Sequence, residues 1–473
     1  MKNRSFFIQL TLIVLICILM VIGYFTTKQI LFFNQSKNLN LILISVDTLR
    51  PDHMGVYGYN KNTTPNIDKW AKDAMVFSNV RTIVPVTYPS FAALMTGSHS
   101  LDNKIINNQS LQLSRNTQTL AKMLKEKGFS TSAFITSEVL SQELTNMDNG
   151  FDTYRELKEK GDFEEFVNSA LNALEKNNQG KKFFWIHFTN PHWPYEPTRD
   201  NKCRFGPQYC DIISEKGYIQ LEEERKQMQA WGTDSCRQEE MPKQTKELYE
   251  SLYDGEIADT DFYINKVLNT LKKTGLDKNS IVVFYADHGE GFDHNYYFTH
   301  GGVLYDSALK IPLIIKFPNT NKRGKTDVLI DNADIFTTLS KIYGLRIEAK
   351  NTIDFSEMFH SDFFSNLLIS KKKYIISINE GWNRYSITDN KFKYILNNPQ
   401  SCKLKGADEE LYNLKADPKE ALNILKKDPT RALYYKKLLL EHLSQYNLPQ
   451  FTNVNSSEIK GTEDLEKLKS LGY

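Results

Sequence analysis

The sequence has little cysteine, no excess of either charge and no internal repeat. Its 473 residues include five cysteines, 59 lysines and arginines, and 57 aspartates and glutamates, for a formal net charge of +2. The low cysteine content excludes a small disulfide-stabilised protein. The sequence contains no Cys-x-x-Cys pair, the spacing that would indicate a zinc site. The balanced charge gives no support for nucleic acid as a partner. Hydrophobic residues make up 40% of the chain, which is typical of a globular protein that buries a large core.

One segment stands apart from a chain whose mean hydropathy is only −0.47. Residues 6–25 (FFIQLTLIVLICILMVIGYF) carry no charge, and a helix of this length spans roughly 30 Å, the hydrocarbon thickness of a bilayer. Lys2 and Arg4 favour a cytoplasmic N-terminus over residues 1–5. No small-x-small cleavage site follows, so we expect an uncleaved single-pass anchor in the cell membrane rather than a cleaved signal peptide.

Everything after the anchor is then expected on the extracytoplasmic side, with residues 26–38 as a tether. Four cysteines, an even number, fall on this oxidising side: Cys203, Cys210, Cys236 and Cys402. Cys203 and Cys210 lie close together in a polar stretch and are candidates for one local bridge. Four free thiols are the alternative.

Short apolar runs alternate with helical patterns over residues 39–345. The runs that we predict as buried strands are 39–46, 129–135, 183–188, 280–286 and 310–317. The stretches with helical periodicity are 65–74, 90–95, 119–127 and 249–273. This alternation predicts an α/β fold whose mainly parallel sheet is covered by helices on both faces.

The pattern changes beyond residue 345. Strand-like pieces at 374–378, 385–388 and 392–396, followed by a helical stretch at 431–446, indicate a smaller α+β subdomain with an antiparallel sheet over 346–450. Residues 451–473 form a polar tail. A second polar stretch, 200–245, holds three cysteines and is predicted to be an insertion in the larger domain.

Acidic residues follow two of the predicted strands at the point where each strand ends. Asp47 follows 39–46, and Asp287 with His288 follows 280–286. In an open α/β sheet, ligands gather at the carboxyl ends of the strands, and two carboxylates with one imidazole suit a divalent cation. A lone aspartate after a strand is more often a turn residue or a helix cap.

A hydroxyl group precedes a predicted helix start in residues 84–97 (VPVTYPSFAALMTG). Thr87 lies immediately before the predicted helix N-terminus at Pro89 and Ser90, where free N–H groups and the helix dipole favour an anion such as a phosphoryl group. A hydroxyl placed there against a metal loses its proton more easily and becomes a nucleophile. Taken alone, the segment is better interpreted as a plain helix cap.

Seven strings in order resemble the sulfatase family of the alkaline-phosphatase superfamily, and the resemblance covers nearly all of the chain after the anchor. Residues 47–55 (DTLRPDHMG) match the D-x-x-R-x-D-x-x-G opening of that family. The strings that follow are TTPNID (63–68), GFDTY (150–154), NPHWPY (190–195), DHGE (287–290), HGGVLYD (300–306) and ELYNL (410–414) with DPKE (417–420). The resemblance implies an alkaline-phosphatase-like fold: a mixed, mainly parallel central sheet between helices, with a C-terminal four-stranded antiparallel sheet and a helix.

The resemblance also implies roles for individual residues. Asp47, Asp287 and His288 hold one divalent metal ion, and Thr87 falls at the nucleophile position, which also touches the metal. His192 and His300 match positions that contact the transferred group or protonate the leaving oxygen. Asn108 and Arg50 are the expected substrate contacts, whereas Asp293 and His294 surround the site or have no role. The polar stretch 200–245 follows the His192 loop directly, so we expect it to shape substrate choice.

The sequence departs from a true sulfatase at the nucleophile. Sulfatases carry Cys or Ser in C-x-P-S-R, where oxidation gives formylglycine, but residues 87–91 read TYPSF. Oxidation of a threonine gives a ketone, so formylglycine cannot form, and a Thr87 nucleophile instead forms an ordinary ester that water or an alcohol displaces. Phe91 replaces the arginine, and FSTSAFITSE (129–138) replaces a lysine-bearing G-K-W-H stretch. With fewer cations, the site suits a singly charged diester better than a dianionic monoester.

These observations predict a membrane-anchored, metal-dependent hydrolase that acts on phosphoric, or less readily sulfuric, esters. The metal is Ca²⁺, Mn²⁺, Zn²⁺ or Mg²⁺, and the sequence selects neither the ion nor the oligomeric state. One alternative is a transferase that moves a phosphoryl headgroup to a lipid or glycan of the cell envelope. Another is a non-catalytic binding protein on a decayed sulfatase scaffold.

Overall fold

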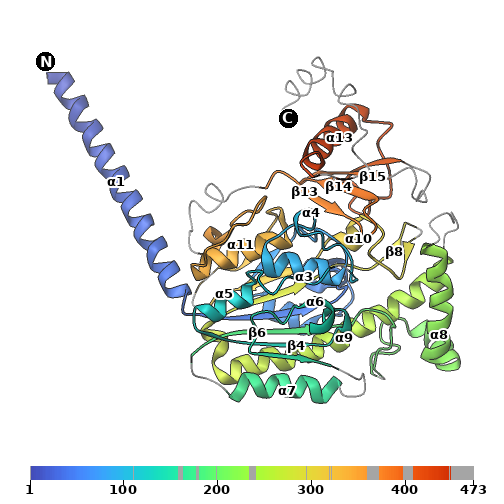
Figure 1. Cartoon of the computed structure of the whole chain (residues 1–473). Helices are drawn as coiled ribbons and strands as arrows, with labels where there is room; N and C mark the ends of the chain where they lie inside the picture. Colours follow the sequence, from blue (N-terminus) through green and yellow to red (C-terminus); the bar gives the residue numbers. More distant parts are fainter. Residues whose placement is uncertain are drawn as a thin grey trace.

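A mixed eight-stranded sheet lies at the centre of the molecule (Figure 1). The structure is a computed structural model that describes residues 2–109, 111–157, 163–176, 180–198, 200–233, 241–294, 296–318, 320, 322–359, 372–397, 408–446 and 448. The strand order is β11-β2-β10-β7-β1-β6-β4-β5, and every pairing is parallel except those of β10 with β7 and β2. The bounds of the strands are β1 Asn40–Val46, β2 Met75–Phe77, β4 Phe129–Ile135, β5 Thr153–Glu156, β6 Lys181–Phe188, β7 Ser280–Ala286, β10 Leu313–Lys316 and β11 Gly324–Thr326.

Helices cover both faces of this sheet. On one side lie α3 (Thr87–Thr96), α5 (Leu120–Glu126) and α11 (Asn332–Tyr343), and on the other lie α7 (Phe163–Lys176) and α9 (Lys243–Thr274) (Figure 1). Because neither face meets water, all residues of β1 and β7 are buried. The predicted fold class, an α/β protein with a mainly parallel sheet between helices, is confirmed.

Several shorter elements complete the larger domain. They are α2 (Pro65–Ala71), α4 (Ser100–Asn103), α6 (Gln142–Thr145), α10 (Asp306–Leu309) and the 3₁₀ turn Glu138–Leu140. Two pairs of short strands are β3 (Val80–Arg81) with β12 (Ile330–Asp331), and β8 (Phe292–Asp293) with β9 (Tyr296–Tyr297).

The C-terminal part forms a separate antiparallel sheet with one helix across it, as expected (Figure 1). The strands follow sequence order: β13 Ile375–Ile378, β14 Arg384–Thr388, β15 Phe392–Asn397 and β16 Glu409–Asn413. The helix α13 spans Pro429–Leu443. Cys402 and the tail 451–473 lie outside the described residues.

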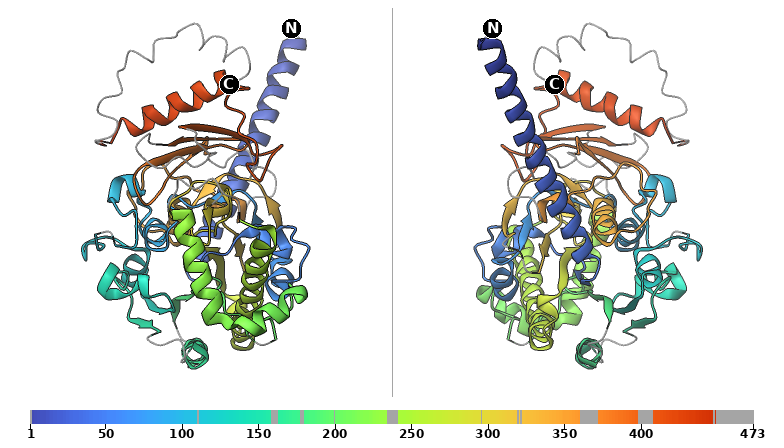
Figure 2. Two further views of the ribbon diagram at one scale, coloured as in Figure 1. Left: turned by 90° about the vertical axis from the view of Figure 1, so that its right-hand side faces the viewer. Right: turned by 90° about the vertical axis from the view of Figure 1, so that its left-hand side faces the viewer.

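The N-terminal helix α1 (Lys2–Ser36) projects from the body of the protein (Figures 1 and 2). Residues 26–38, predicted as a tether, are helical through Ser36, because the apolar run resumes at Ile30 and its end packs on the body: the Phe32 ring lies 5.2 Å from that of Phe317. Among the described residues, the stretch Thr11–Ser36 is long and apolar enough to cross a membrane, a test of length and composition that a signal sequence also passes.

The polar stretch 200–245 contains a long helix that its composition did not predict. Helix α8 spans Cys210–Thr233, with a kink at Gly217, and packs beside α9. Cys203 and Cys210 form the local disulfide considered from the sequence, with 5.2 Å between their Cα atoms. Cys236 lies outside the described residues.

Buried charges join the C-terminal sheet to the larger domain. Lys393 on β15 is fully buried, and its Nζ lies 2.5 Å from Asp306 Oδ1 and 2.8 Å from Glu420 Oε1. Arg81 pairs with the other oxygen of Asp306 at 2.7 Å. Burial opposes ionisation of Asp306, but Arg81 and Lys393 outweigh it and hold the pKa of this carboxyl well below its usual range. The strings HGGVLYD and DPKE therefore supply the carboxylates of an inter-domain ion cluster.

We expect Lys393→Met to lower the free energy of unfolding by about 3–5 kcal/mol, because it leaves two buried carboxylates without their shared cation. Lys391→Met, at an exposed position in the same hairpin, is the control, with an expected change within about 0.5 kcal/mol. Urea unfolding of the full chain in detergent measures both. Since the folded pKa of Asp306 is lowered, its contribution is present above pH ~4 and is lost as the pH falls below that value. Equal urea midpoints for the two variants would contradict this account.

Candidate active site

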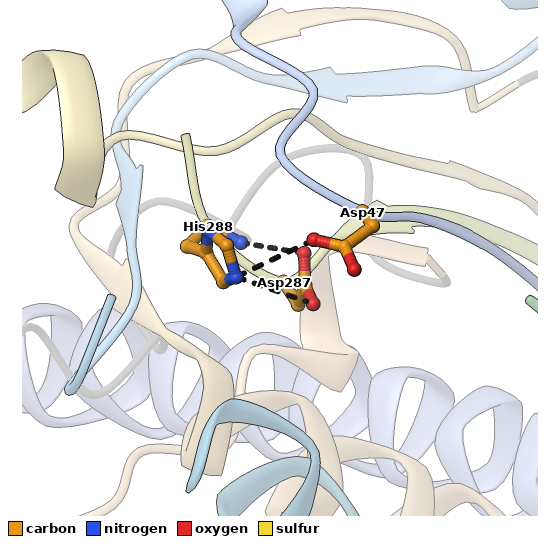
Figure 3. A group of neighbouring side chains, drawn as sticks. All are labelled: Asp47, Asp287 and His288. Atoms are coloured by element: carbon orange, nitrogen blue, oxygen red, sulfur yellow. Dashed lines mark hydrogen bonds and ion pairs between the residues drawn. The ribbon is translucent and has the colours of Figure 1, made fainter. Parts of the chain in front are cut away.

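Two parallel neighbouring strands bring three of the predicted metal ligands together (Figure 3). Val46 of β1 pairs with Ala286 of β7, so Asp47 and Asp287 follow at the same edge of the sheet. His288 Nε2 lies 3.4 Å from Asp47 Oδ1 and 3.6 Å from Asp287 Oδ2. One ligand atom from each of the three side chains falls within a group no more than 4.8 Å across. All three side chains are buried.

The donor set fits a divalent cation. Asp287 Oδ1 accepts from the backbone N–H groups of Thr48, at 3.2 Å, and His288, at 2.9 Å. In the described part of the chain, Asp47 Oδ1 and Asp287 Oδ2 are buried with no hydrogen-bond partner. Burial and mutual repulsion raise the pKa of Asp47, and burial raises that of Asp287. Two buried carboxylate oxygens that lack donors, beside one imidazole nitrogen, are the arrangement that a bound cation would satisfy.

Thr87 lies against this group at the start of α3. The helix begins at Thr87 itself, two residues earlier than Pro89, and the hydroxyl oxygen Oγ1 is 3.3 Å from His288 Nε2. Ser90 connects α3 to the end of β7, because its hydroxyl donates to the backbone carbonyl of Asp287 at 2.8 Å. The threonine hydroxyl and the three candidate ligands therefore share one place in the fold.

Asn108 is held beside Thr87 by the backbone. Its side-chain oxygen accepts from the N–H of Tyr88 at 3.0 Å, and Asn108 lines the same cavity as Thr87. This N–H belongs to the first turn of α3. Asn108 therefore occupies one of the free backbone N–H groups that were expected to bind an anion at the helix N-terminus. Since the oxygen is engaged, the amide nitrogen of Asn108 is the donor that it can offer to a substrate.

The two predicted histidines lie together beside His288. The ring of His300 lies 4.1 Å from that of His288 and 5.4 Å from that of His192. Burial opposes protonation of His300, but a 3.4 Å hydrogen bond to Glu290 and the nearby carboxylates raise its pKa. Burial and His300 lower the pKa of His192 to about 4. The pKa values of the two histidines are therefore shifted in opposite directions.

These residues open into one cavity of about 750 Å³. Asp47, Thr87, Asn108, His192 and His300 all line it. Its other charged lining residues are acidic: Glu138, Glu196, Glu256, Asp259 and Glu380. Among the described residues that line the cavity, none is lysine or arginine. The cavity therefore attracts cations and disfavours a substrate with several negative charges.

Two acidic groups that the sequence did not assign support His300. Glu290, fully buried, accepts from His300 Nδ1 and, at 3.1 Å, from the hydroxyl of Tyr195. Glu380 comes from the turn after β13, and a Cβ at Gly301 would lie 2.6 Å from its carboxylate oxygens. Glu290 stands in the DHGE string, so its position was visible in the sequence. Glu380 lies far along the chain with no such signal.

Three residues near the ends of β1 and β7, Arg50, Asp293 and His294, form ion pairs with other side chains. The Arg50 guanidinium pairs with Asp52 at 2.8 Å and donates to the Glu290 carbonyl at 3.0 Å, and Arg50 is not among the described residues that line the cavity. These contacts indicate that Arg50 braces the loop of Glu290, and its expected contact with substrate stays a prediction. His294 pairs with Asp293 at 2.7 Å and stacks on Tyr305.

Phe91, which stands where sulfatases have arginine, belongs to the core. It is fully buried, and its ring lies 4.9 Å from that of Trp185, 5.0 Å from that of His187 and 5.9 Å from that of Tyr285. A charged side chain directed into this aromatic cluster would lose its hydration without gaining a partner. At this position the chain therefore has an apolar core side chain in place of the arginine of the motif.

Comparison with known proteins assigns the family. The family model named Sulfatase matches residues 39–345. The chain belongs to the sulfatase family. An arylsulfatase of Clostridium perfringens is 23% identical over 85% of this chain and 94% of its own length. The prediction that this chain is an ester hydrolase is confirmed by its membership of this family.

Solved structures support the same fold. An enzyme in complex with its substrate D-glucosamine-2-N,6-O-disulfate superposes with a TM-score of 0.69 at 19% identity, covering 88% of this chain and all of that one. The phosphonate monoester hydrolase of Agrobacterium radiobacter gives 0.63 at 17% identity, covering 86% of this chain and 96% of its own. The alkaline-phosphatase-like architecture is therefore shared by proteins whose names give different ester chemistries.

Proposed function

We propose that this member of the sulfatase family is a metal-dependent phosphoesterase that uses Thr87 as its nucleophile, without formylglycine. The observation that carries the proposal is the position of Thr87 Oγ1, 3.3 Å from His288 Nε2 in the group that Asp47 and Asp287 complete. A divalent cation held by these side chains would favour the deprotonated hydroxyl and offset charge on the ester oxygens. Asp47, Asp287, His288 and Thr87 Oγ1 are the residues that would hold it.

The side chains of the cavity account for both chemical steps. Thr87 Oγ1, deprotonated, attacks phosphorus; the Oγ1–P bond forms as the bond to the leaving oxygen breaks. His300, whose Nδ1 is held by Glu290, donates a proton to the leaving oxygen, and the Asn108 amide nitrogen donates to a phosphoryl oxygen. Water then attacks phosphorus and breaks the Oγ1–P bond, while its proton returns to His300. His192 accepts a hydrogen bond from the incoming water through its neutral ring.

The charge of the cavity supports a singly charged ester as the substrate. A dianionic monoester or a polysulfated sugar would face the carboxylates of Glu138, Glu196 and Glu380 with no lysine or arginine among the described lining residues. A diester carries one negative charge at the reacting phosphorus, and the metal site can neutralise it. Electrostatic repulsion by the walls therefore selects against the more highly charged esters.

We also propose that α1 anchors the enzyme in the cell membrane, with the cavity on the extracytoplasmic side. The apolar side chains from Leu12 to Met20 that are described as exposed range from 47 to 62% exposed, so the protein does not cover this face. Lipid would cover it instead. The Cys203–Cys210 disulfide supports an oxidising compartment.

A panel of esters tests this function. We expect the full chain in detergent, supplied with a divalent ion, to turn over a phosphodiester about tenfold or more faster than the matched dianionic phosphate monoester, because repulsion of about 1.4 kcal/mol gives that ratio. An excess of an acceptor alcohol separates hydrolysis from headgroup transfer by the product that forms. Turnover of sulfate esters alone would contradict the proposal.

A further inference from the structure

The helix in the 200–245 insertion packs against the His192 loop. Arg225 of α8 has a side chain that is 1% exposed, and its guanidinium carbon Cζ lies 4.1 Å from the centre of the Trp193 ring. Glu222, one turn earlier, accepts from this guanidinium through both carboxylate oxygens, at 2.8 and 2.9 Å. The buried Arg225 guanidinium is paired with Glu222 along one edge and stacks on the indole of Trp193. This stacking holds the Trp193 ring in one orientation.

Trp193 in turn orients the histidine that precedes it. His192 Nδ1 lies 2.7 Å from the backbone carbonyl of Trp193, and the two rings are 5.1 Å apart. A carbonyl can only accept a hydrogen bond, so Nδ1 carries the proton and Nε2 is the ring nitrogen left for the cavity. The direction of Nε2 therefore depends on where residue 193 is held.

Other contacts keep α8 in register with this loop. The hydroxyl of Tyr218, also on α8, donates to the carbonyl of Pro197 at 2.6 Å, close to the far end of the loop. Tyr249 of α9 donates to the carbonyl of Leu221 at 2.8 Å and so fixes α8 to the helix that lines the cavity. The disulfide between Cys203 and Cys210 closes the connection between the loop and α8.

We propose that Arg225 is a positioning residue that acts on the reaction through Trp193, by fixing the ring of His192. The insertion thus contributes to the active site from outside the cavity. This inference rests on the proposed role of His192, and it gives α8 a function that its polar composition alone does not suggest.

A double-mutant cycle tests the inference. Arg225→Met should lower kcat about tenfold with KM within about twofold, since misorienting a reacting group costs turnover more than binding. In a His192→Ala background the same substitution should change kcat by less than about twofold. Lys226→Met, at the next and exposed position of α8, is the control and should leave kcat unchanged. The emission of Trp193, isolated by comparison with Trp193→Phe, should shift in Arg225→Met independently of activity.

The outcomes separate the inference from the proposed function. An equal loss of kcat in both backgrounds, or no loss in a folded Arg225→Met protein, would overturn the inference alone. If Thr87→Ala stays active, the proposed function fails first. Should Arg225→Met not fold, Arg225→Lys carries the same cycle, because lysine keeps the charge near Glu222 but cannot provide the planar stack.

Discussion

Thr87→Ala is expected to lower phosphodiester turnover by about a thousandfold or more, because it removes the side-chain atom proposed to bond to phosphorus. The methyl side chain of alanine leaves Asp47, Asp287 and His288 in place, so binding of the metal should persist. Steady-state kinetics with a chromogenic diester measures the loss, and metal analysis of the same preparation checks the site. Loss of activity with the metal retained is the result that distinguishes a nucleophile from a structural residue.

Two variants control for the change of shape at residue 87. Thr87→Ser keeps a hydroxyl at the same place and should retain measurable turnover. Thr96→Ala removes a threonine from the other end of α3, where its hydroxyl donates to the Ala92 carbonyl and accepts from the Ser98 N–H, and should leave kcat within about twofold. A Thr87→Ala protein that turns over diesters as the wild type does would refute the proposed chemistry. Equal losses in all three variants would assign the effect to damage of α3.

The sequence was sufficient to predict that Asp47, Asp287 and His288 lie close together. Asp47 and Asp287 each follow an apolar run, and the parallel register of β1 with β7 brings the two ends together. Strands buried on both faces are largely apolar, so the sequence indicates both that they exist and where they end. The same reasoning located the antiparallel C-terminal strands, whose turns carry polar residues.

Other features depend on contacts between distant segments and could not be predicted. Helix α8 is amphiphilic only weakly, and it is defined by its packing on α9 and on the His192 loop rather than by its own pattern. Arg50 stands in the D-x-x-R motif, but only the structure shows that its guanidinium pairs with Asp52, two residues away. Glu380 reaches His300 from the other subdomain, and only the tertiary fold brings it there.

Asp287→Asn is expected to abolish binding of the divalent ion, and the thermal stability of the variant should show why. In the ion-free wild type, burial raises the pKa of both Asp47 and Asp287, and repulsion by Asp287 raises that of Asp47 further. Removing the charge of Asp287 relieves that repulsion. In EDTA the variant should therefore melt at or above the temperature of the wild type, although it is the variant that has lost a ligand.

Adding the ion should reverse this order. A ligand at a hundred times its Kd stabilises the folded state by about 2.7 kcal/mol, so the wild type should gain several degrees while Asp287→Asn does not respond. Asp277→Asn, which precedes the opposite end of β7, should bind and respond as the wild type does. Metal analysis and melting curves with and without EDTA measure all three proteins. If the wild type neither holds an ion nor shifts on its addition, the carboxylates are a remnant of a decayed scaffold, and a metal-dependent mechanism at Thr87 has no basis.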